Sequence, residues 1–270
     1  MDFKTGQIGI AAGRLLSGRD LGLAAAMNVP WLRVRRRPRV AVLSTGNELV
    51  LPGEPLGANQ VFDANGVALA GLIASAGGIP VNLGIASDTP ESLLACAGAA
   101  EGADLLVISG GASGGDYDLV RQVLGERGLA IEFWKAAMRP GGPLMFGRAG
   151  SLPVLGLPGN PVSCLVSALL FLRPAVQVLL GRSPVDDRAA EAVPSARLSA
   201  PLEANDERQS YLRATLSREH ASGNLIATPF PHQDSSMLSR LAWADCLVVR
   251  EPLAPAAVVG DRVEIIPLIE

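Results

Sequence analysis

Glycines and carboxylates gather behind one apolar run of the chain. In "ISGGASGGDYDLV", residues 108 to 120, glycines stand at 110, 111, 114 and 115, and Asp116 and Asp118 follow them. Glycine costs backbone entropy and leaves its amide uncovered. Bare amides at a helix N-terminus bind phosphate, and carboxylates beside them suit a hard cation such as Mg²⁺. The segment therefore predicts that its glycines admit a phosphate and its aspartates hold the metal bound to that phosphate. The candidate binding residues of this glycine loop are Ser109, Gly110, Gly111, Ser113 and Gly114, with Asp118 on the metal side.

Three further loops follow apolar runs and carry similar groups. "STGNELV" (44–50) supplies Gly46 and Glu48, "VFDANG" (61–66) supplies Asp63, and "GIASDTPE" (84–91) supplies Asp88. A structural alternative stays open, because Asp63, Asn65, Asp88 and Asp118 all stand where short polar side chains cap helices. Capping explains the aspartates but not the density of glycine.

Two later segments carry cations and turn residues. "FWKAAMRPGGP" (133–143) places Lys135 and Arg139 four residues apart, either as anion ligands or as ordinary surface cations. "GLPGNPVS" (156–163) reads as a turn at Gly159, an N-cap at Asn160 and a first helical residue at Pro161. The helix behind it is almost wholly apolar, so we expect its N-terminus to be buried or at an interface. There the helix dipole favours an oxyanion. Capping leaves Pro158 unexplained.

The elements that position these loops alternate in type. Such alternation predicts an α/β fold, a mostly parallel sheet with helices on both faces, whose ligand site lies beyond the carboxyl ends of the strands. We expect strands at 40–44, 81–86, 104–109 and 131–135 and near Leu144 and Val154, and helices at 65–76, 91–100, 118–127 and 161–180.

The period of apolar residues changes after Gly181. A charged, proline-punctuated stretch at 182–194 marks a boundary. Strands are then expected at 211–216, 225–228, 244–249 and 262–266, with one short helix at 236–241. We therefore predict three parts: residues 1–37, the remnant of an N-terminal domain with a helix at 21–27 capped by Asp20 and strands near Ile8 and at 31–36; an α/β domain, 38–181; and a small, mostly β C-terminal domain, 182–270.

Composition excludes several classes of function. A net charge of -3 and a pI near 5.5 argue against a nucleic-acid partner. Cys96, Cys164 and Cys246 are expected to be buried free thiols, and with only two histidines any metal is expected to be held by oxygen. The apolar run 162–172 is too short for a bilayer and the N-terminus lacks a secretion pattern. We expect a cytoplasmic protein without membrane contact.

Four motifs in order give the chain a family resemblance. "RPRVAVLSTGNELV", "DLLVISGGASGGDYDLV", "FWKAAMRPGGPLMFG" and "GLPGNPVS" resemble the molybdopterin molybdenumtransferases of molybdenum-cofactor synthesis, the MoeA-type enzymes, and the related C-terminal domain of gephyrin. "DERQSYLRATL" and "SSMLSRLAWADCLVV" extend the likeness more weakly into the β domain. The resemblance implies insertion of molybdate into adenylylated molybdopterin, with Mg²⁺-dependent release of AMP.

The resemblance also implies roles for individual residues. Glu48, Asp88 and Asp118 would be acidic catalytic groups, with Asp88 and Asp118 as metal ligands. Lys135 and Arg139 would be catalytic cations that meet phosphate or molybdate. The substrate-binding residues would be Asp63, the glycine-loop residues listed above, Pro158, Gly159, Asn160 and Pro161, together with Arg208, Ser235 and Ser236 of the small domain.

The chain departs from the family pattern at three places. Arg139 and Gly142 stand where lysines are usual, and most of the long N-terminal region of the family does not precede residue 38. The family implies a homodimer whose site joins the large domain of one subunit to the small domain of the other, and a molybdopterin adenylyltransferase as a further partner. Two alternatives are a non-catalytic binding or scaffold module and an adenylyltransferase itself. Ser109, Ser113 and residues 195–270 count against the adenylyltransferase.

Overall fold

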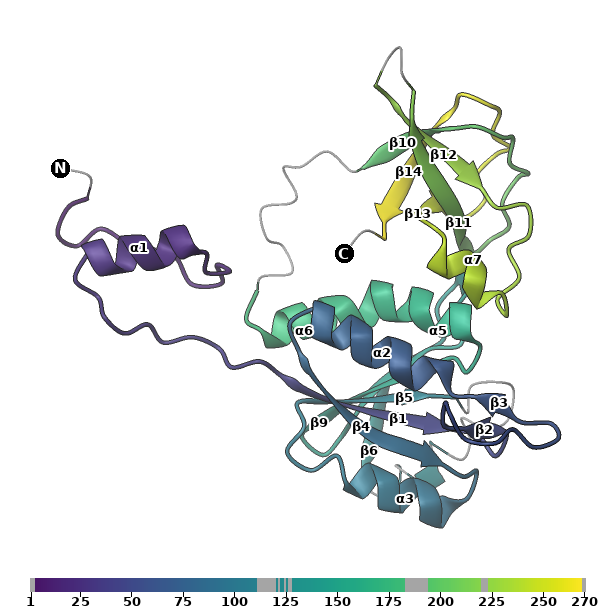
Figure 1. Ribbon diagram of the computed structural model, residues 1–270, viewed down its shortest axis with the longest axis horizontal. Helices are drawn as coiled ribbons and strands as arrows, with labels where there is room; N and C mark the ends of the chain where they lie inside the picture. The colour runs from purple at the N-terminus through teal and green to yellow at the C-terminus, as the bar shows by residue number, and fades with distance from the viewer. Residues whose placement is uncertain are drawn as a thin grey trace.

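The computed structural model describes residues 3–110, 120, 122, 123, 125, 128–182, 194–219 and 223–268. Its secondary structure forms two six-stranded sheets, a two-stranded ribbon and helices (Figure 1). The first sheet and its helices make an α/β unit, and the second sheet makes a β unit.

The first sheet is mostly parallel, as predicted. Its order is β4-β1-β5-β9-β8-β6. Every residue of β1 after Arg39 is buried, as is the whole of β5, and such unbroken apolar strands are typical of a sheet covered on both faces. The strands are β1 (Arg39–Thr45), β4 (Ile79–Ala86), β5 (Leu105–Ser109) and β9 (Leu152–Leu157), all parallel, and β8 (Met145–Ala149) and β6 (Leu129–Trp134), which are antiparallel.

Helices cover both faces of this sheet, which confirms the predicted fold class (Figure 1). On one face, α2 (Ala64–Ser75) and the long helix that begins at Pro161 pack over alternate residues of β1 and β5, such as Val42 and Val107. On the other, α3 (Pro90–Gly98) packs over the intervening residues, such as Leu43 and Ile108. Val120 and Val123, in the segment predicted as a helix, join this second core.

The long helix has three parts: α5 (Pro161–Ser167), a π-helical turn η1 (Ala168–Leu172) and α6 (Arg173–Leu179). Pro174 lacks an amide hydrogen, so the regular bond pattern cannot continue through it, and the π turn lies directly before it. These 19 residues are long and apolar enough to cross a membrane. Cys164, Ala168, Leu172 and Val176 lie in the core of the α/β unit, however, and core packing accounts for the helix's apolarity.

The second sheet closes on itself. Its order is β12-β10-β14-β13-β11-β7, and β12 also pairs with β11. Four strands and the short helix α7 (Leu238–Ala242) match the expected mostly β domain, whereas β10 was not predicted. The strands are β10 (Ser195–Leu198), β11 (Gln209–Arg218), β12 (Leu225–Pro229), β13 (Cys246–Arg250) and β14 (Arg262–Pro267).

The sixth strand of this sheet comes from the α/β part of the chain. β7 (Met138–Arg139) pairs in parallel with β11, Met138 opposite Gln209 and Arg139 opposite Ser210. A shared cluster that includes Met138, Val162, Val166 and Leu247 fills the space between the two units. The two units are thus connected by the pairing of β7 with β11 and by a shared hydrophobic cluster. The residue limits predicted for the domains stay a prediction.

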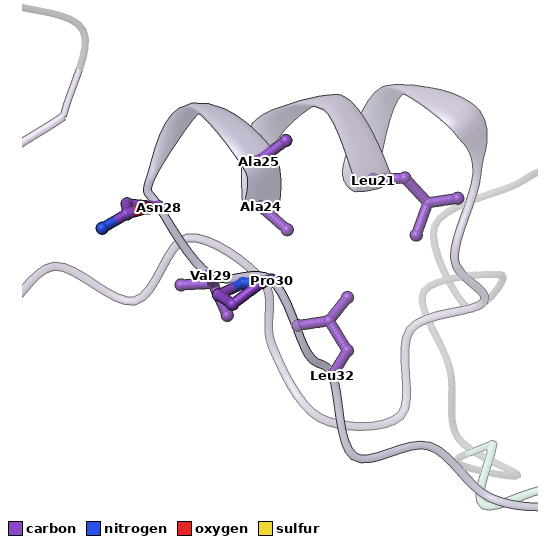
Figure 2. Close-up of a pocket in the computed structure, with 7 residues that line it drawn as sticks. All are labelled: Leu21, Ala24, Ala25, Asn28, Val29, Pro30 and Leu32. Atoms are coloured by element: carbon purple, nitrogen blue, oxygen red, sulfur yellow. The ribbon is translucent and has the colours of Figure 1, made fainter.

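Residues 3–37 differ from the prediction in their details. The helix is α1 (Gly18–Ala26), and Ser17 rather than Asp20 is its cap, because Asp20 closes a capping box as the third helical residue. The expected strands near Ile8 and at 31–36 are wrong: turns and bends surround Ile8, and residues 31–36 have no regular secondary structure. Figure 1 shows α1 apart from both sheets. A mostly apolar pocket of about 420 Å³ lies between α1 and residues 28–32, and Figure 2 shows the residues that line it.

Candidate functional site

Three loops of the α/β unit approach one another at the carboxyl ends of the parallel strands. Gly110 follows β5 with φ +105, and a β-carbon there would overlap the carbonyl oxygen of Thr45 at the end of β1. A β-carbon on Gly159, after β9, would lie 3.3 Å from the Gly110 α-carbon. The Gly110 amide also donates to the Leu157 carbonyl at 3.3 Å. Only glycine fits at position 110, because a side chain there would overlap the Thr45 backbone. The Gly110 amide is bonded within the protein, however, and is not uncovered as the sequence predicts.

Asn65 ties these loops to α2. Its side-chain amide donates to Ser109 Oγ at 2.9 Å and to the Gly159 carbonyl at 2.8 Å. Asn65 is buried, and its Oδ1 and Thr45 Oγ1 have no hydrogen-bond partner among the described residues. Ser109 Oγ also lies 3.5 Å from the sulfur of Cys164. A buried polar network thus fixes the loops at the carboxyl ends of these strands.

Asp63 belongs to that network as a helix cap. Its Oδ1 accepts from the Gly66 amide at 2.9 Å and its Oδ2 accepts from Ser44 Oγ at 2.7 Å. Asp63 is buried, so both oxygens serve α2 and β1. For Asp63 the capping alternative is therefore borne out in the structure.

Asp88 is not a helix cap. Thr89 caps α3, and Asp88 instead makes a reciprocal pair with Asn47: the Asn47 amide donates to Asp88 Oδ2 and the Asp88 amide donates to Asn47 Oδ1, each at 3.1 Å. The carboxylate of Glu48 folds back over Gly46 in the same turn, since a β-carbon on Gly46 would lie 2.6 Å from its oxygens. The structure thus brings Glu48 and Asp88 to one exposed turn.

Glu48 and Asp88 offer two exposed carboxylates at this turn. Carboxylate oxygens are the ligands that Mg²⁺ favours, and Asp88 Oδ1 has no hydrogen bond within the described ranges. Those ranges contain no cluster of three or more His, Cys, Asp or Glu side chains able to hold a metal. Asp118, the second expected ligand, lies outside them, as do Gly111, Ser113, Gly114 and Asp116.

The "GLPGNPVS" loop lies at the junction of the two units. Pro158 is buried and Pro161 starts α5, but the Asn160 side chain does not cap the helix. Asn160 is nevertheless the N-cap residue and Pro161 the first helical residue, as predicted, although the exposed Asn160 side chain makes no hydrogen bond to the amides of the first turn. The Val162 amide instead donates to the carbonyl of Ser235 from the β unit at 3.2 Å. The start of α5 and Ser235 are therefore in contact within a single chain.

Two predicted cations meet between the units. Arg139 donates from Nε to Ser210 Oγ at 2.7 Å and from Nη2 to Asn205 Oδ1 at 3.0 Å. Arg208 Nη2 lies 2.7 Å from Asp206 Oδ2, and Arg139 Nη1 lies 3.3 Å from the same oxygen. Hydrogen bonds from Arg208 are the main cause that lowers the pKa of Asp206. We call Arg139, Asp206 and Arg208 the arginine cluster. Its two guanidinium groups converge on one carboxylate within a single chain.

Lys135 and Gly142 stand before and after β7, the strand that carries Arg139. Lys135 is exposed at the end of β6, with φ 66, and its amide donates to the Leu144 carbonyl at 2.8 Å. A β-carbon on Gly142 would lie 2.9 Å from the Met138 carbonyl oxygen and 3.2 Å from that of Ala136. The glycine that replaces the family's lysine is thus enclosed by backbone. No hydrogen bond or ion pair in the described part of the chain joins Lys135 to Arg139.

Ser235 and Ser236 lie on a loop fixed from inside the β unit. Ser236 Oγ donates to Asp234 Oδ1 at 2.6 Å. Beneath the loop, the buried Arg213 donates from Nε to Gln233 Oε1 at 3.1 Å and from Nη1 to the Met237 carbonyl at 3.2 Å. Burial lowers the pKa of Arg213. These bonds hold both ends of the serine loop.

Sequence reasoning missed several of these positioning residues. Asn47, Asn205, Asp206 and Ser210 each bind a predicted site residue, and Arg213 holds the serine loop. Asn47 and Asp206 stand within two residues of predicted site residues, which is a usable signal. No such signal marks Arg213, because a single arginine in a predicted strand is usually interpreted as a surface residue.

Comparisons with known proteins identify both units. Residues 41–178 match a family described as a probable molybdopterin binding domain, and residues 195–268 match the MoeA C-terminal region, domain IV. The chain is 35% identical over 232 residues to molybdopterin molybdenumtransferase 2 of Mycobacterium tuberculosis, covering 84% of this chain and 56% of the relative. For the molybdopterin molybdenumtransferase of a Nostoc species, identity is 35%, with 80% of this chain and 53% of the relative covered.

A solved structure agrees. A molybdopterin biosynthesis MoeA protein of Pyrococcus horikoshii superposes with a TM-score of 0.79 at 31% identity, over 98% of this chain and 63% of that one. The chain spans little more than half the length of the curated relatives it matches. Matching families over both units, together with the four sequence motifs, place the chain in the molybdopterin molybdenumtransferase family.

Proposed function

We propose that the protein acts in molybdenum-cofactor biosynthesis by inserting molybdate into adenylylated molybdopterin, with Mg²⁺-dependent release of AMP. One observation carries the proposal: the exits of β1, β4, β5 and β9 bring glycine backbone, Asn65 and the Glu48–Asp88 turn to a single edge of the sheet. The names of the relatives support the reaction class.

The residues at this edge suit the parts of such a reaction. The Gly110 amide is bonded to the Leu157 carbonyl, so the other backbone amides of the glycine loop would bind the phosphate oxygens. Asp88 would hold Mg²⁺ together with Asp118, and Glu48 would accept a proton from an attacking water. Bound Mg²⁺ would supply charge neutralisation and a more acidic water. Asn47 would act through Asp88, by orienting its carboxylate.

The arginine cluster would bind the second substrate. Guanidinium groups bind tetrahedral oxyanions through charge-assisted hydrogen bonds. Arg139 and Arg208 would therefore hold molybdate, with Lys135, Ser235 and Ser236 nearby and Pro158 and Pro161 shaping the pocket. The implied homodimer, an adenylyltransferase that supplies the substrate, and a cytoplasmic location complete the proposal.

AMP release from adenylylated molybdopterin tests the proposal. Asp88→Asn keeps the shape of the side chain but removes a metal-binding charge, and we expect AMP release to fall by about 100-fold or more. Glu91→Gln in α3 is the matched control, a nearby exposed carboxylate assigned no role, and it should keep full rate. Equal rates in wild type and Asp88→Asn would contradict the assignment.

The alternative is a binding or scaffold module without catalysis. The retained Asp88, Lys135 and glycine edge favour the enzyme, because pure binding does not need a metal-side carboxylate. Binding of adenylylated molybdopterin without any AMP release in the wild-type protein would favour the module.

A further inference from the structure

The Asp206 carboxylate binds both guanidinium groups of the arginine cluster. Arg208 holds it three times, from its amide to Oδ1 at 2.9 Å and from Nε and Nη2 to Oδ2 at 3.3 and 2.7 Å. Arg139 reaches the same Oδ2 at 3.3 Å. One carboxylate oxygen thus lies where two cations converge.

The two arginines have supports that do not depend on Asp206. The Arg139 backbone is paired with Ser210 in the sheet, and its side chain donates to Ser210 Oγ and to Asn205 Oδ1. The side-chain amide of Asn205 in turn donates to the carbonyls of Arg208, Arg250 and Glu251 at 2.8, 3.1 and 2.8 Å. If the Asp206 carboxylate turned away, we therefore expect the Arg139 guanidinium and the Arg208 backbone to stay in place.

The ion pairs of Asp206 are open to exchange. The side chains of Arg139, Asp206 and Arg208 are 46%, 37% and 49% exposed, and water screens ion pairs at such a site, which makes them weak. A tetrahedral dianion carries two charges and four acceptor oxygens, so it can engage both guanidinium groups at once. A monoanion offers no more charge than the carboxylate that it must displace.

We propose that Asp206 is an internal competitor for the oxyanion site, so that a tetrahedral dianion binds Arg139 and Arg208 only by displacing the Asp206 carboxylate. Asp206 thereby lowers affinity for every anion and selects dianions over monoanions. This inference rests on the proposed function, because it takes the arginine cluster as the anion site. The dianion is either free molybdate or the phosphate group of a nucleotide.

Calorimetric titration of the full chain with molybdate, with AMP and with perchlorate tests this competition. Asp206→Asn removes the competing charge, and we expect molybdate to bind at least about fivefold more tightly than to wild type. Perchlorate, which wild type should barely bind, should gain measurable affinity. Glu207→Gln is the matched control: it removes the same charge from the next residue, which is exposed and makes no ion pair in the described structure. It should change affinity by less than about twofold. Asp206→Ser provides a second variant.

The outcomes separate this inference from the proposed function. Equal molybdate affinity in wild type, Asp206→Asn and Asp206→Ser would overturn the competition and leave the anion site in place. Weaker binding in both variants would make Asp206 a support for the arginines, which also overturns it. If only AMP binds more tightly to Asp206→Asn than to wild type, the dianion that displaces Asp206 is the phosphate group of a nucleotide. If no protein binds any dianion, and Arg139→Gln leaves AMP release unchanged, both the competition and the arginine anion site are wrong, whereas the Asp88 assignment stands.

Discussion

The glycine-lined strand edge and the arginine cluster, the two anion sites that we propose, are built in opposite ways. At the strand edge, backbones approach closely enough to exclude a β-carbon, and the polar side chains of Ser44, Asp63 and Asn65 are buried. In the arginine cluster the charges are exposed and share a replaceable partner. The first region is fixed by sterics and burial, the second by exchangeable charge. Substitutions should therefore affect stability at the first and affinity at the second.

The sharpest way to break this contrast is Gly110→Ala. The new β-carbon would overlap the Thr45 carbonyl at a φ of +105, so we expect the free energy of unfolding to fall by roughly 3 kcal/mol or more. Gly102→Ala is the control, because Gly102 also has positive φ, +78, but faces open space. It should cost about 1 to 2 kcal/mol. Equal losses by urea denaturation would show that the close approach is not what fixes this edge.

The reactivity of Cys164 reports on the same edge. Burial raises the pKa of the Cys164 thiol, beside Ser109, to about 12, and the pKa of Cys246 to about 12 as well. Thiol reagents attack the thiolate, so at pH 8 both thiols should stay unmodified until the protein opens, whereas the partly exposed Cys96 reacts first. Counting thiols with a chromogenic disulfide should give one fast thiol in native protein and three in denaturant. Fast modification of Cys164 in the native protein would mean that the edge is mobile.

Asn65→Ala probes the buried network directly. The substitution removes the bonds to Ser109 and to the Gly159 carbonyl in a buried position, and we expect a loss of about 2 to 3 kcal/mol in unfolding free energy. Asn82→Ala, on the exposed face of β4, should cost roughly 0.5 kcal/mol. A loss for Asn65→Ala as small as that of the control would place the network outside the stable core.

The smallest stability effect is expected at Asp206→Asn. Its ion pairs are exposed, so the midpoint of thermal unfolding should shift little in low salt and not at all in high salt. A large, salt-independent loss of stability would make the arginine cluster structural, and the contrast between the two regions would then fail.

The sequence predicted the strand edge better than the arginine cluster. The strands and the loops after β1, β4, β5 and β9 follow from local apolar periods and from glycine, which act over a few residues. The two-residue strand β7 was out of reach because its pairing with β11 depends on how the two units meet. Asp206 stands two residues from Arg208, which is a local signal, but its pairing with Arg139 also depends on how the two units meet. The cap of α3 was open to error because Asp88 and Thr89 are adjacent and both can cap.

Titration of adenylylated molybdopterin into the protein, with Mg²⁺ and molybdate present, tests the central claim most directly. Plain molybdopterin is the comparison ligand, and Asp88→Asn is the comparison protein. If the glycine edge and its carboxylates form the nucleotide side of the site, the adenylylated form should bind wild type more tightly than the plain form, and Asp88→Asn should lose that preference. Equal affinity for the two ligands, or an unchanged preference in Asp88→Asn, would contradict the account.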